Sequence, residues 1–275
     1  VKERTAEIEK QNKLIQEQNS EIIVQNKRIV AQNEEITGSI RYAGKIQNAA
    51  LPEFELYKHH INGFFILFKP RDIVSGDFYW ITETQNKFVA AAVDCTGHGV
   101  PGGFLSMLGI SFLNEIVKDI ARKKEEIKAA DILNRLRKKI IITLNQQADE
   151  MSRDGMDMAM IIYDKEKKIL NFAGANNPGY IIRDGNIHKL EADRMPIGFN
   201  RKLNDTPFSN KFLKVIDDDL IYLFSDGYAD QFGGRRGKKF NSRRFRELLV
   251  HLQQFPMEQQ KDIADKILQK WQRNN

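Results

Sequence analysis

The chain has 275 residues, 41% of them hydrophobic, which is enough for one domain with a substantial core plus an extension. Its net charge of +6 is a small surplus of 43 basic over 37 acidic residues, a composition that argues against nucleic-acid binding. The single cysteine, Cys95, excludes a disulfide framework, so we expect a reducing compartment, the cytoplasm. We find no run of about eighteen apolar residues and no secretory signal, and expect no membrane contact by this segment.

Residues 1 to about 50 carry a seven-residue repeat. Isoleucine recurs at every seventh position, and asparagine follows four residues after it: Ile8, Ile15, Ile22, Ile29 and Ile36, with Asn12, Asn19, Asn26 and Asn33. With isoleucine at d and asparagine at a, this seam predicts a parallel homodimeric coiled coil in which asparagine pairs fix the register. The alternatives are an inert spacer or a lone helix, which would be poorly stable in water. The repeat narrows after Gly38, and Leu51-Pro52 is predicted to end the helix.

The rest of the chain alternates short strand-like runs with helical stretches. Strands are predicted at residues 64–68, 73–81, 87–93, 156–163, 169–173, 180–183 and 220–224. Helices are predicted at residues 102–120, 126–147, 242–252 and 257–271. Strands follow closely on strands and the helices are grouped between such blocks, which disfavours regular βαβ winding. We therefore expect an antiparallel α+β sandwich.

Three apolar runs each deliver an aspartate beside a glycine, at Asp77, Asp94 and Asp226. A carboxylate at a buried strand end is costly unless it is paired or bound to a metal ion. A ligand set made only of oxygen selects Mg²⁺ or Mn²⁺ over zinc. Zinc held by Cys95 and His98 together with Asp94 is the alternative, but one thiol and one imidazole do not complete a structural tetrahedron.

Six motifs point to a specific family. In order along the chain they read SGDFYW, AVDCTGHGVPGGFLS, GMDMAMIIYD, LNFAGANNPGYIIRDG, MPIGF and LFSDGYADQFGG. Over roughly residues 60–250 this series resembles the SpoIIE and RsbU-like bacterial branch of the PPM phosphatases, which are similar to protein phosphatase 2C. The resemblance implies an αββα sandwich of two mainly antiparallel sheets flanked by helices, in residues 51–275, behind a coiled-coil helix in residues 1–50.

The same resemblance implies a function. It predicts metal-dependent hydrolysis of phosphoserine or phosphothreonine on a partner protein, with an anti-sigma-factor antagonist as one typical substrate. Regulation is expected to act through the N-terminal coiled coil, by a change of helix register or dimer geometry transmitted through Gly38 to Leu51. The rival function is that of a dimeric pseudophosphatase, which binds a phosphorylated partner without cleaving it.

The resemblance also implies a site for two Mn²⁺ or Mg²⁺ ions. Asp94 resembles the carboxylate that bridges both ions, and Asp77 supports the first. The backbone carbonyl of Cys95 resembles a further ligand, and Asp226 would hold the second ion. Two cations about 3.5–4 Å apart lower the pKa of a shared water and neutralise phosphoryl oxygens. His98 is either the acid that protonates the leaving group or a brace for its loop.

Three further assignments stay open. Asp154 or Asp157 resembles a weak third-metal ligand of some relatives. Arg71 is either a phosphate-binding arginine or one half of a surface salt bridge. The basic stretch from Arg235 to Arg246 is either a solvated loop or an electropositive lip for a phosphorylated or acidic partner.

Both ends of the chain carry expectations about a longer parent. The chain opens with Val1 inside the repeat, so we expect a sensor upstream. Members of the branch end with a strand bearing an Asp-Asp pair, which is missing before Asn275, and Asp217–Asp219 enter their strand at the end opposite to Asp226. We favour a shortened chain over a decayed site, because the other motifs are intact. We then expect weak binding of the second ion and low turnover.

Overall fold

The computed structural model describes residues 2–53, 57, 61, 63–146, 154–203, 205–235 and 237–273. The chain forms two compact units, Val1–Ile46 and Gln47–Asn275. The division falls within the N-terminal helix, four residues before the domain boundary expected from the sequence. Gln47 belongs to the second unit because its side chain is bonded there, as described below.

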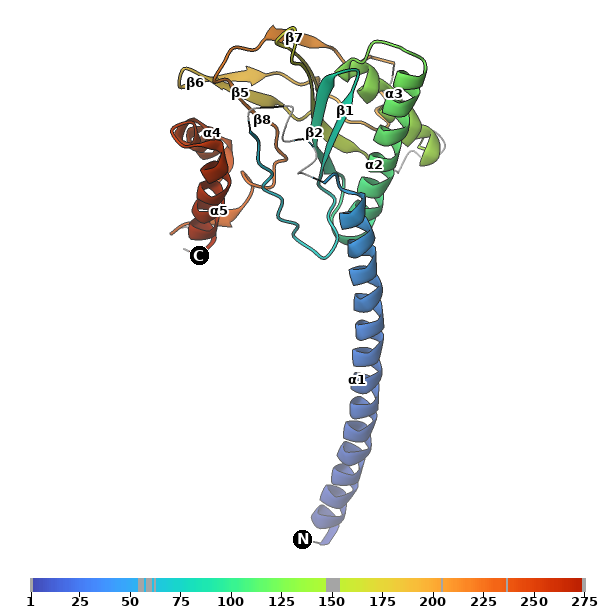
Figure 1. Cartoon of the computed structure of the whole chain (residues 1–275). Helices are drawn as coiled ribbons and strands as arrows, with labels where there is room; N and C mark the ends of the chain where they lie inside the picture. The colour runs from blue at the N-terminus through green and yellow to red at the C-terminus, as the bar shows by residue number, and fades with distance from the viewer. Residues whose placement is uncertain are drawn as a thin grey trace. The chain divides into compact units, whose positions relative to one another are not determined.

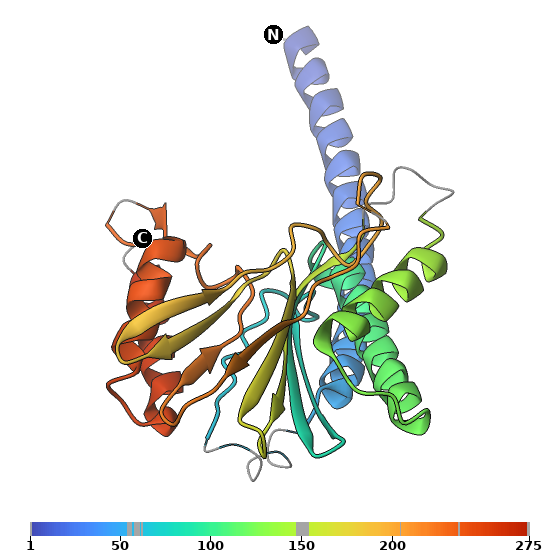
Figure 2. The ribbon, with the colours of Figure 1, turned by 90° about the horizontal axis from the view of Figure 1, so that it is seen from above.

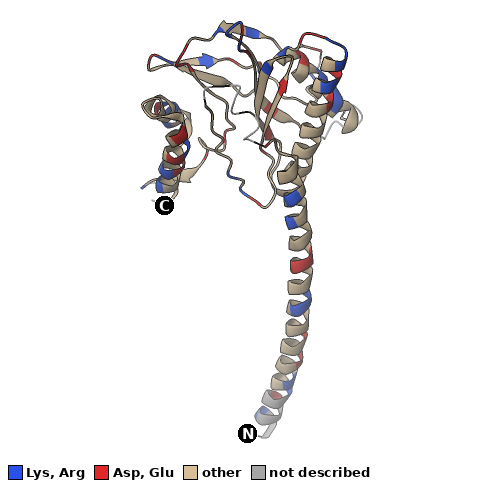
Figure 3. Cartoon of the chain, in the orientation of Figure 1, with Lys and Arg blue, Asp and Glu red and all other residues tan. Residues whose placement is uncertain are grey.

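Helix α1 runs without a break from Lys2 to Ala50 (Figure 1). At about 1.5 Å per residue, its 49 residues extend over about 74 Å. The helix ends directly before Leu51-Pro52, as predicted, because proline disfavours helical geometry in the residue before it. Acidic and basic residues are interspersed along α1 (Figure 3). The side chain of Ile8 lies outside the described part, but the other seam isoleucines expose 51% to 57% of their surface: Ile15, Ile22, Ile29 and Ile36.

The second unit contains two antiparallel sheets and a short hairpin. The larger sheet has the order β1-β2-β3-β4-β7 and the smaller one β6-β5-β8. The larger sheet is made of β1 Phe78–Thr84, β2 Lys87–Cys95, β3 Met156–Asp164, β4 Ile169–Ala175 and β7 Lys211–Lys214. The smaller sheet is made of β5 Gly179–Arg183, β6 Asn186–Leu190 and β8 Leu220–Tyr222. The hairpin pairs β9 Phe232–Gly233 with β10 Lys238–Lys239.

Helices cover the outer faces of the two sheets. Helices α2 (Gly99–Arg122) and α3 (Ala129–Thr143) lie against the larger sheet, and α4 (Asn241–Leu252) and α5 (Met257–Arg273) lie beyond the smaller one (Figures 1 and 2). The order of layers is therefore helix, sheet, sheet, helix. This confirms the α+β sandwich expected from the sequence.

Alternating side chains of the central strand β3 explain why this layering is stable. Met158, Met160 and Ile162 pack into the core formed with α2 and α3. Ala159 and Ile161 point the other way, into a second core between the sheets. Successive side chains of a strand face opposite sides of a sheet, so a strand that is apolar throughout must be covered on both faces.

The smaller sheet follows the same rule. Tyr180 and Ile182 of β5 pack with Leu248 and Leu252 of α4, whereas Ile181 joins the core between the sheets. Each sheet thus shares the middle layer and has an outer helical layer of its own. Burial of apolar area on both faces is the main stabilising contribution to such a sandwich.

Helix α2 is the one helix in the described part of the chain that is long and apolar enough to cross a membrane. From the sequence, no run of about eighteen apolar residues was expected in this region. Half of its most apolar window is buried inside the domain, and Leu105, Ile110, Leu113 and Ile116 pack in the core with the larger sheet. This packing accounts for its apolar composition.

Several predicted elements are corrected by the structure. Residues 64–68 form no strand, because Phe65 and Leu67 pack against the core beside α4 and α5 without pairing to a sheet. The strand predicted at 73–81 begins only at Phe78. Strands β6, β7, β9 and β10 were not predicted, and α3 is shorter than the predicted helix, whose end at Gln147 lies outside the described residues. Apolar alternation reports burial, and burial does not require a hydrogen-bonded ladder.

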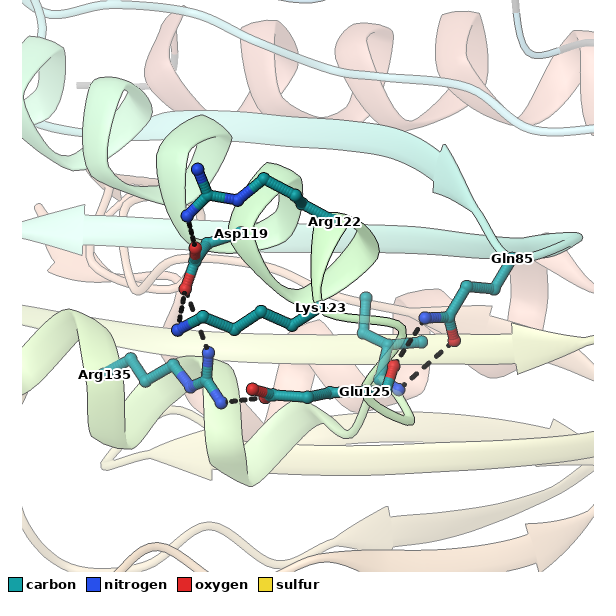
Figure 4. Close-up of polar contacts among 7 residues, drawn as sticks. Gln85, Asp119, Arg122, Lys123, Glu125 and Arg135 are labelled. Carbon is teal, nitrogen blue, oxygen red and sulfur yellow. Dashed lines mark hydrogen bonds and ion pairs between the residues drawn. The ribbon is translucent and has the colours of Figure 1, made fainter.

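An exposed polar network joins the ends of α2 and α3 (Figure 4). Asp119 pairs with Arg122 at 2.7 Å and with Lys123 at 2.8 Å, and Arg135 pairs with Glu125. The side chain of Gln85, in the β1–β2 turn, donates to the carbonyl of Glu125 at 2.5 Å. Exposed pairs of this kind stabilise weakly, by roughly 0–1 kcal/mol each. They link residues at the connection between α2 and α3. This connection lies beside the β1–β2 turn, at the end of the larger sheet remote from Asp94.

Candidate active site

Strand pairing brings Asp77 beside Asp94. Asp77 precedes β1, and Asp94 is the last residue but one of β2. The two strands are antiparallel with Phe78 opposite Val93, so the start of β1 lies next to the end of β2. The strand predicted at residues 73–81 includes Asp77, which is wrong, because residues 73–77 form bends and irregular backbone and β1 begins only at Phe78. The juxtaposition of the two carboxylates comes from the register.

Close packing of glycines holds these segments together. A Cβ atom on Gly76 would lie 2.6 Å from the carbonyl oxygen of Gly97 and 3.3 Å from that of Cys95. A Cβ atom on Gly102, in the first turns of α2, would also lie 2.6 Å from the Gly97 oxygen. Such distances exclude any side chain at both positions. Gly97 itself has a φ of +86°, which favours glycine.

Asp157 on β3 lies directly opposite Asp94 in the sheet. Its Oδ1 accepts a hydrogen bond from the Asn176 side chain at 2.9 Å. Burial raises the pKa of Asp157, and the charge of Asp226 adds to the rise. Asp154 is exposed and lies beyond the start of the strand. Of the two residues left open by the sequence, Asp157 is the one that lies opposite Asp94 and has a charge interaction with it.

Asp226 reaches the site from the smaller sheet. It follows β8 by four residues, and the hydroxyl of the preceding Ser225 donates to Oδ2 of Asp77 at 2.6 Å. The Asn177 side chain donates to the carbonyl of Phe224, which ties the β4–β5 connection to this segment. Neither Ser225 nor Asn177 was singled out from the sequence. Both lie inside quoted motifs, but the motif does not reveal which side chain orients a neighbour.

Electrostatic strain is concentrated on these carboxyl groups. Burial, followed by the charges of Asp77 and Asp226, raises the pKa of Asp94 to about 8. Burial, followed by the charges of Asp230 and Asp77, raises the pKa of Asp226. Within the described ranges, no lysine, arginine or histidine forms an ion pair with Asp77, Asp94, Asp157 or Asp226. Half-buried like charges without a counter-charge favour protonation or a bound cation.

The donor chemistry of this cluster fits hard divalent cations, because its side chains offer only carboxylate oxygens. In the described part of the chain, no three His, Cys, Asp or Glu side chains stand in a ready-made metal-binding arrangement. Instead, the charges of Asp77 and Asp226 both act on Asp94, which shows that the three carboxyl groups lie near one another. Like charges gathered in a partly buried site repel one another. A hard divalent cation would relieve this repulsion, and Asp77, Asp94 and Asp226 are the residues that would hold it.

Cys95 and His98 differ from the pattern of a zinc site. The Cys95 side chain is buried in the apolar core, and burial raises the pKa of its thiol well above the usual range. The His98 ring is exposed, and its Nδ1 lies 3.3 Å from Oδ2 of Asp72. A buried neutral thiol is a poor zinc ligand, since zinc binds the thiolate. The Cys95 carbonyl oxygen lies next to Gly76, 3.3 Å from where a Cβ atom on that glycine would be.

The remaining candidates lie apart from this cluster. Arg71 is exposed and forms no ion pair with another described residue, so the salt-bridge interpretation finds no partner there. Asp219 precedes β8 and pairs with Arg183, at the strand end opposite to Asp226 as expected. Asp265 of α5 pairs with Lys69. The last residues, Asn274 and Asn275, lie outside the described range.

Comparisons with known proteins point to one family and one fold. The profile of the family named stage II sporulation protein E (SpoIIE) matches residues 84–275. The SiaA-PP2C domain of Pseudomonas aeruginosa shares 31% sequence identity, covering 88% of this chain and 92% of that one, with a TM-score of 0.76. No curated protein sequence matches the chain.

Two more distant structures share the fold. The PP2C phosphatase domain and regulatory-domain fragment of SpoIIE from Bacillus subtilis has 20% identity and a TM-score of 0.56, covering 74% of this chain and 54% of that one. The RsbU and RsbW domains of Rv1364c from Mycobacterium tuberculosis have 15% identity and a TM-score of 0.56, covering 74% and 53%. At such identities the likeness concerns the fold alone.

Proposed function

The chain belongs to the stage II sporulation protein E family, in the SpoIIE/RsbU-like branch of the PPM serine/threonine phosphatases, and we propose that Asp77, Asp94 and Asp226 hold two divalent cations at its catalytic centre. The observation that carries the proposal is the gathering of carboxylates without a described cationic partner: strand register brings Asp77 and Asp157 beside Asp94, and the Ser225 hydrogen bond to Asp77 ties in the segment that bears Asp226. The bound Mn²⁺ or Mg²⁺ ions supply charge neutralisation for the phosphoryl group and activation of a water molecule. The choice between these two metals is part of the experiment below.

Each residue has a separate role in this proposal. Asp94 is the proposed bridging ligand, because the charges of both Asp77 and Asp226 act on it. Ser225 orients Asp77 through its hydroxyl, and Asn176 orients Asp157, the additional carboxylate at the rim. Groups that orient a metal ligand raise its affinity for the ion. The Cys95 carbonyl is the proposed backbone ligand.

His98 is the proposed proton donor to the leaving alkoxide. It caps the start of α2 without a side-chain hydrogen bond to that helix, so its ring is available for other contacts. Asp72 holds Nδ1, which leaves Nε2 for a substrate oxygen. The loop-bracing role considered from the sequence uses the same Asp72 contact, and the two roles are compatible.

The proposed substrate is phosphoserine or phosphothreonine on a partner protein. The site segments lie at strand ends and Asp226 is exposed, so a protein side chain can approach without passing through the core. An anti-sigma-factor antagonist is the first partner to assay, because the resemblance of the motifs to the SpoIIE and RsbU-like branch implies that class.

The test of catalysis is metal-dependent hydrolysis of p-nitrophenyl phosphate and of a phosphoserine peptide. We expect turnover with Mn²⁺ or Mg²⁺ that EDTA abolishes, and a loss of at least about 10³-fold in Asp94→Asn. The matched control is Asp184→Asn, an exposed turn residue with a φ of 49° that asparagine adopts readily, and it should keep full activity. Binding of the phosphopeptide without turnover would overturn the proposal and favour the pseudophosphatase.

Regulation through α1 is the second part of the proposal. Gln47, in the last turn of α1, is buried, with 4% of its surface exposed. Its amide donates to the Ser75 carbonyl at 2.7 Å and to the Ser106 hydroxyl at 2.6 Å, and its oxygen accepts from the Ser75 N–H at 2.9 Å. Ser75 is two residues from Asp77 in the chain. A rotation of the helix end therefore acts on the segment that bears a metal ligand.

The exposed isoleucine seam of α1 supports pairing with a second copy, as a parallel coiled coil requires. Insertion of one alanine after Ser39 turns the seam by about 100° relative to Gln47. We expect a dimer by light scattering whose turnover changes several-fold while the melting temperature of the domain stays within about 2 °C. Insertion of a full heptad at the same place is the control and should restore wild-type turnover. A monomer, or equal turnover in all three chains, would contradict this part.

A further inference from the structure

A basic surface borders the acidic site. It is formed by the β9–β10 hairpin and the first turns of α4, and we call it the basic lip: Arg235, Lys238, Lys239, Arg243, Arg244 and Arg246. All six side chains belong to exposed residues. Arg236, part of the same stretch, lies outside the described residues. No acidic residue occurs between Arg235 and Arg246 in the sequence.

The lip surrounds an open hollow of about 310 Å³. Its wall consists of Gly233, Gly234, Arg235, Lys238, Arg244 and Trp271. The Gly234 N–H donates to the Trp271 carbonyl at 2.9 Å, and the backbone passes so close that a side chain on Gly233 would collide with that residue. The guanidinium of Arg244 lies 4.8 Å from the centre of the Trp271 ring. These contacts hold the β9–β10 hairpin against the end of α5 beside the hollow.

The cations of the lip divide into two groups. Lys239 pairs with Asp230 at 2.6 Å, and Arg243 pairs with Glu247 at 2.9 Å. Arg235, Lys238, Arg244 and Arg246 form no ion pair with any residue in the described part of the chain, and Arg244 lies over the Trp271 ring. Three of these, Arg235, Lys238 and Arg244, line the hollow. Uncompensated charges around a hollow attract anions from solution.

The lip continues from the active-site segment. The Asp230 N–H donates to the carbonyl of Asp226 at 3.0 Å, and the Asp230 side chain pairs with Lys239 of β10. The charge of Lys239 lowers the pKa of Asp226, against the larger effects that raise it. The lip therefore lies within electrostatic range of a proposed metal ligand, next to the place where a phosphoryl group would bind.

We propose that the basic lip binds acidic residues that flank the phosphorylated serine or threonine of the protein substrate, with Arg235 and Lys238 as the principal contacts. The proposal rests on the function proposed above and adds the chemistry by which this site selects its substrate. A positive surface beside the catalytic site raises the local concentration of an acidic substrate.

The surroundings of Trp271 favour a protein over a nucleic acid as the occupant. Arg244 lies over the Trp271 ring, Phe240 meets it edge-on at 5.4 Å, and the indole N–H donates to the Gln231 carbonyl at 3.1 Å. These contacts leave no open platform for stacking bases, which single-stranded binding requires. Phe232 is exposed, but it is a single ring on the hairpin.

The experiment compares Arg235→Gln/Lys238→Gln with the wild-type chain on three substrates. These are a phosphoserine peptide with aspartates on both sides, the same peptide with asparagines, and p-nitrophenyl phosphate. We expect KM for the acidic peptide to rise about tenfold at unchanged kcat, because a rim charge contributes to encounter and weak binding. Values for the other two substrates should stay within twofold. Added salt should remove the preference of the wild-type chain for the acidic peptide.

The matched control is Lys138→Gln/Lys165→Gln, which removes the same charge from exposed, unpaired positions on α3 and in the β3–β4 turn. It should leave every KM unchanged. An equal rise in KM for both double variants would show an effect of net charge and overturn the proposal. So would equal KM values for the acidic and neutral peptides in the wild-type chain.

A binding assay separates this proposal from the proposed catalysis. The affinity for the labelled acidic phosphopeptide, measured by fluorescence anisotropy, should be about tenfold lower in Arg235→Gln/Lys238→Gln than in the wild-type chain. This result is expected whether or not the chain turns substrate over. If the peptide binds through the lip but is not hydrolysed, the proposed catalytic function is refuted, whereas the proposed role of the lip in binding stands. A labelled single-stranded oligothymidine that binds through the same two residues more tightly than the peptide would overturn the lip assignment instead.

Discussion

Two aspartates at strand ends have opposite environments. Asp219 precedes β8, and 1% of its side chain is exposed. Arg183 donates to both of its oxygens, at 2.8 Å and 2.6 Å, and the Ile216 N–H donates to one of them at 2.9 Å. Burial works against the charged form, but these hydrogen bonds outweigh it and lower the pKa of Asp219. Burial also acts on Asp94, which forms no ion pair with a described cation, and its pKa is raised.

The difference separates a carboxylate with a structural partner from one that we propose holds a metal ion. Asp219 carries its counter-charge within the fold, so its charge is neutralised in every condition near neutral pH. The site around Asp94 and Asp226 lacks such a residue and stores unfavourable like-charge interactions. Burial of a carboxylate is thus uninformative by itself, and the identity of its partner decides the interpretation.

The largest expected effect on stability comes from removing the partner of Asp219. Arg183→Met leaves a nearly buried carboxylate without its bidentate partner, and we expect a loss of roughly 3 kcal/mol in the free energy of unfolding, measured by urea denaturation. The loss should shrink as the pH falls through the lowered pKa of Asp219, because protonation removes the unpaired charge. Activity per folded molecule should be retained.

Arg122→Met is the control for that change. Arg122 pairs with Asp119 at 2.7 Å, but its side chain is 79% exposed, so its removal should cost less than about 0.5 kcal/mol. Equal losses in the two variants would erase the proposed distinction between a buried and an exposed ion pair.

A smaller effect of opposite sign is expected at the active site. The folded-state pKa of Asp94 is raised to about 8, so the stability linked to this group is present at low pH and is lost as the pH rises through that value. In EDTA, Asp94→Asn should therefore be more stable than the wild-type chain at pH 8.5, on the order of 2 kcal/mol, with little difference at pH 5.

Manganese provides the check on this prediction. Saturating Mn²⁺ should stabilise the wild-type chain and have a much smaller effect on Asp94→Asn, since only a protein that binds the ion gains from it. If Asp94→Asn destabilises the metal-free chain at pH 8.5, then the half-buried carboxylates are satisfied by other means and the comparison with Asp219 fails.

The sequence by itself determined the class of fold and the long helix, and it predicted three candidate site residues. The heptad seam and Leu51-Pro52 predicted α1 because helix periodicity and a proline stop are local properties. The recurrence of aspartate beside glycine pointed to Asp77, Asp94 and Asp226 because a buried carboxylate needs a partner wherever it occurs. The site roles assigned to these residues remain predictions for the experiments above.

Only the tertiary structure decided which residues meet. The register of β2 against β3 puts Asp157, rather than Asp154, opposite Asp94. The segment that follows β8 of the smaller sheet brings Ser225 within hydrogen-bonding distance of Asp77. The same long-range packing joins Trp271 of the last helix to the β9–β10 hairpin and turns a run of basic residues into a walled hollow. Pairing between distant segments depends on the whole core, so local patterns do not contain it.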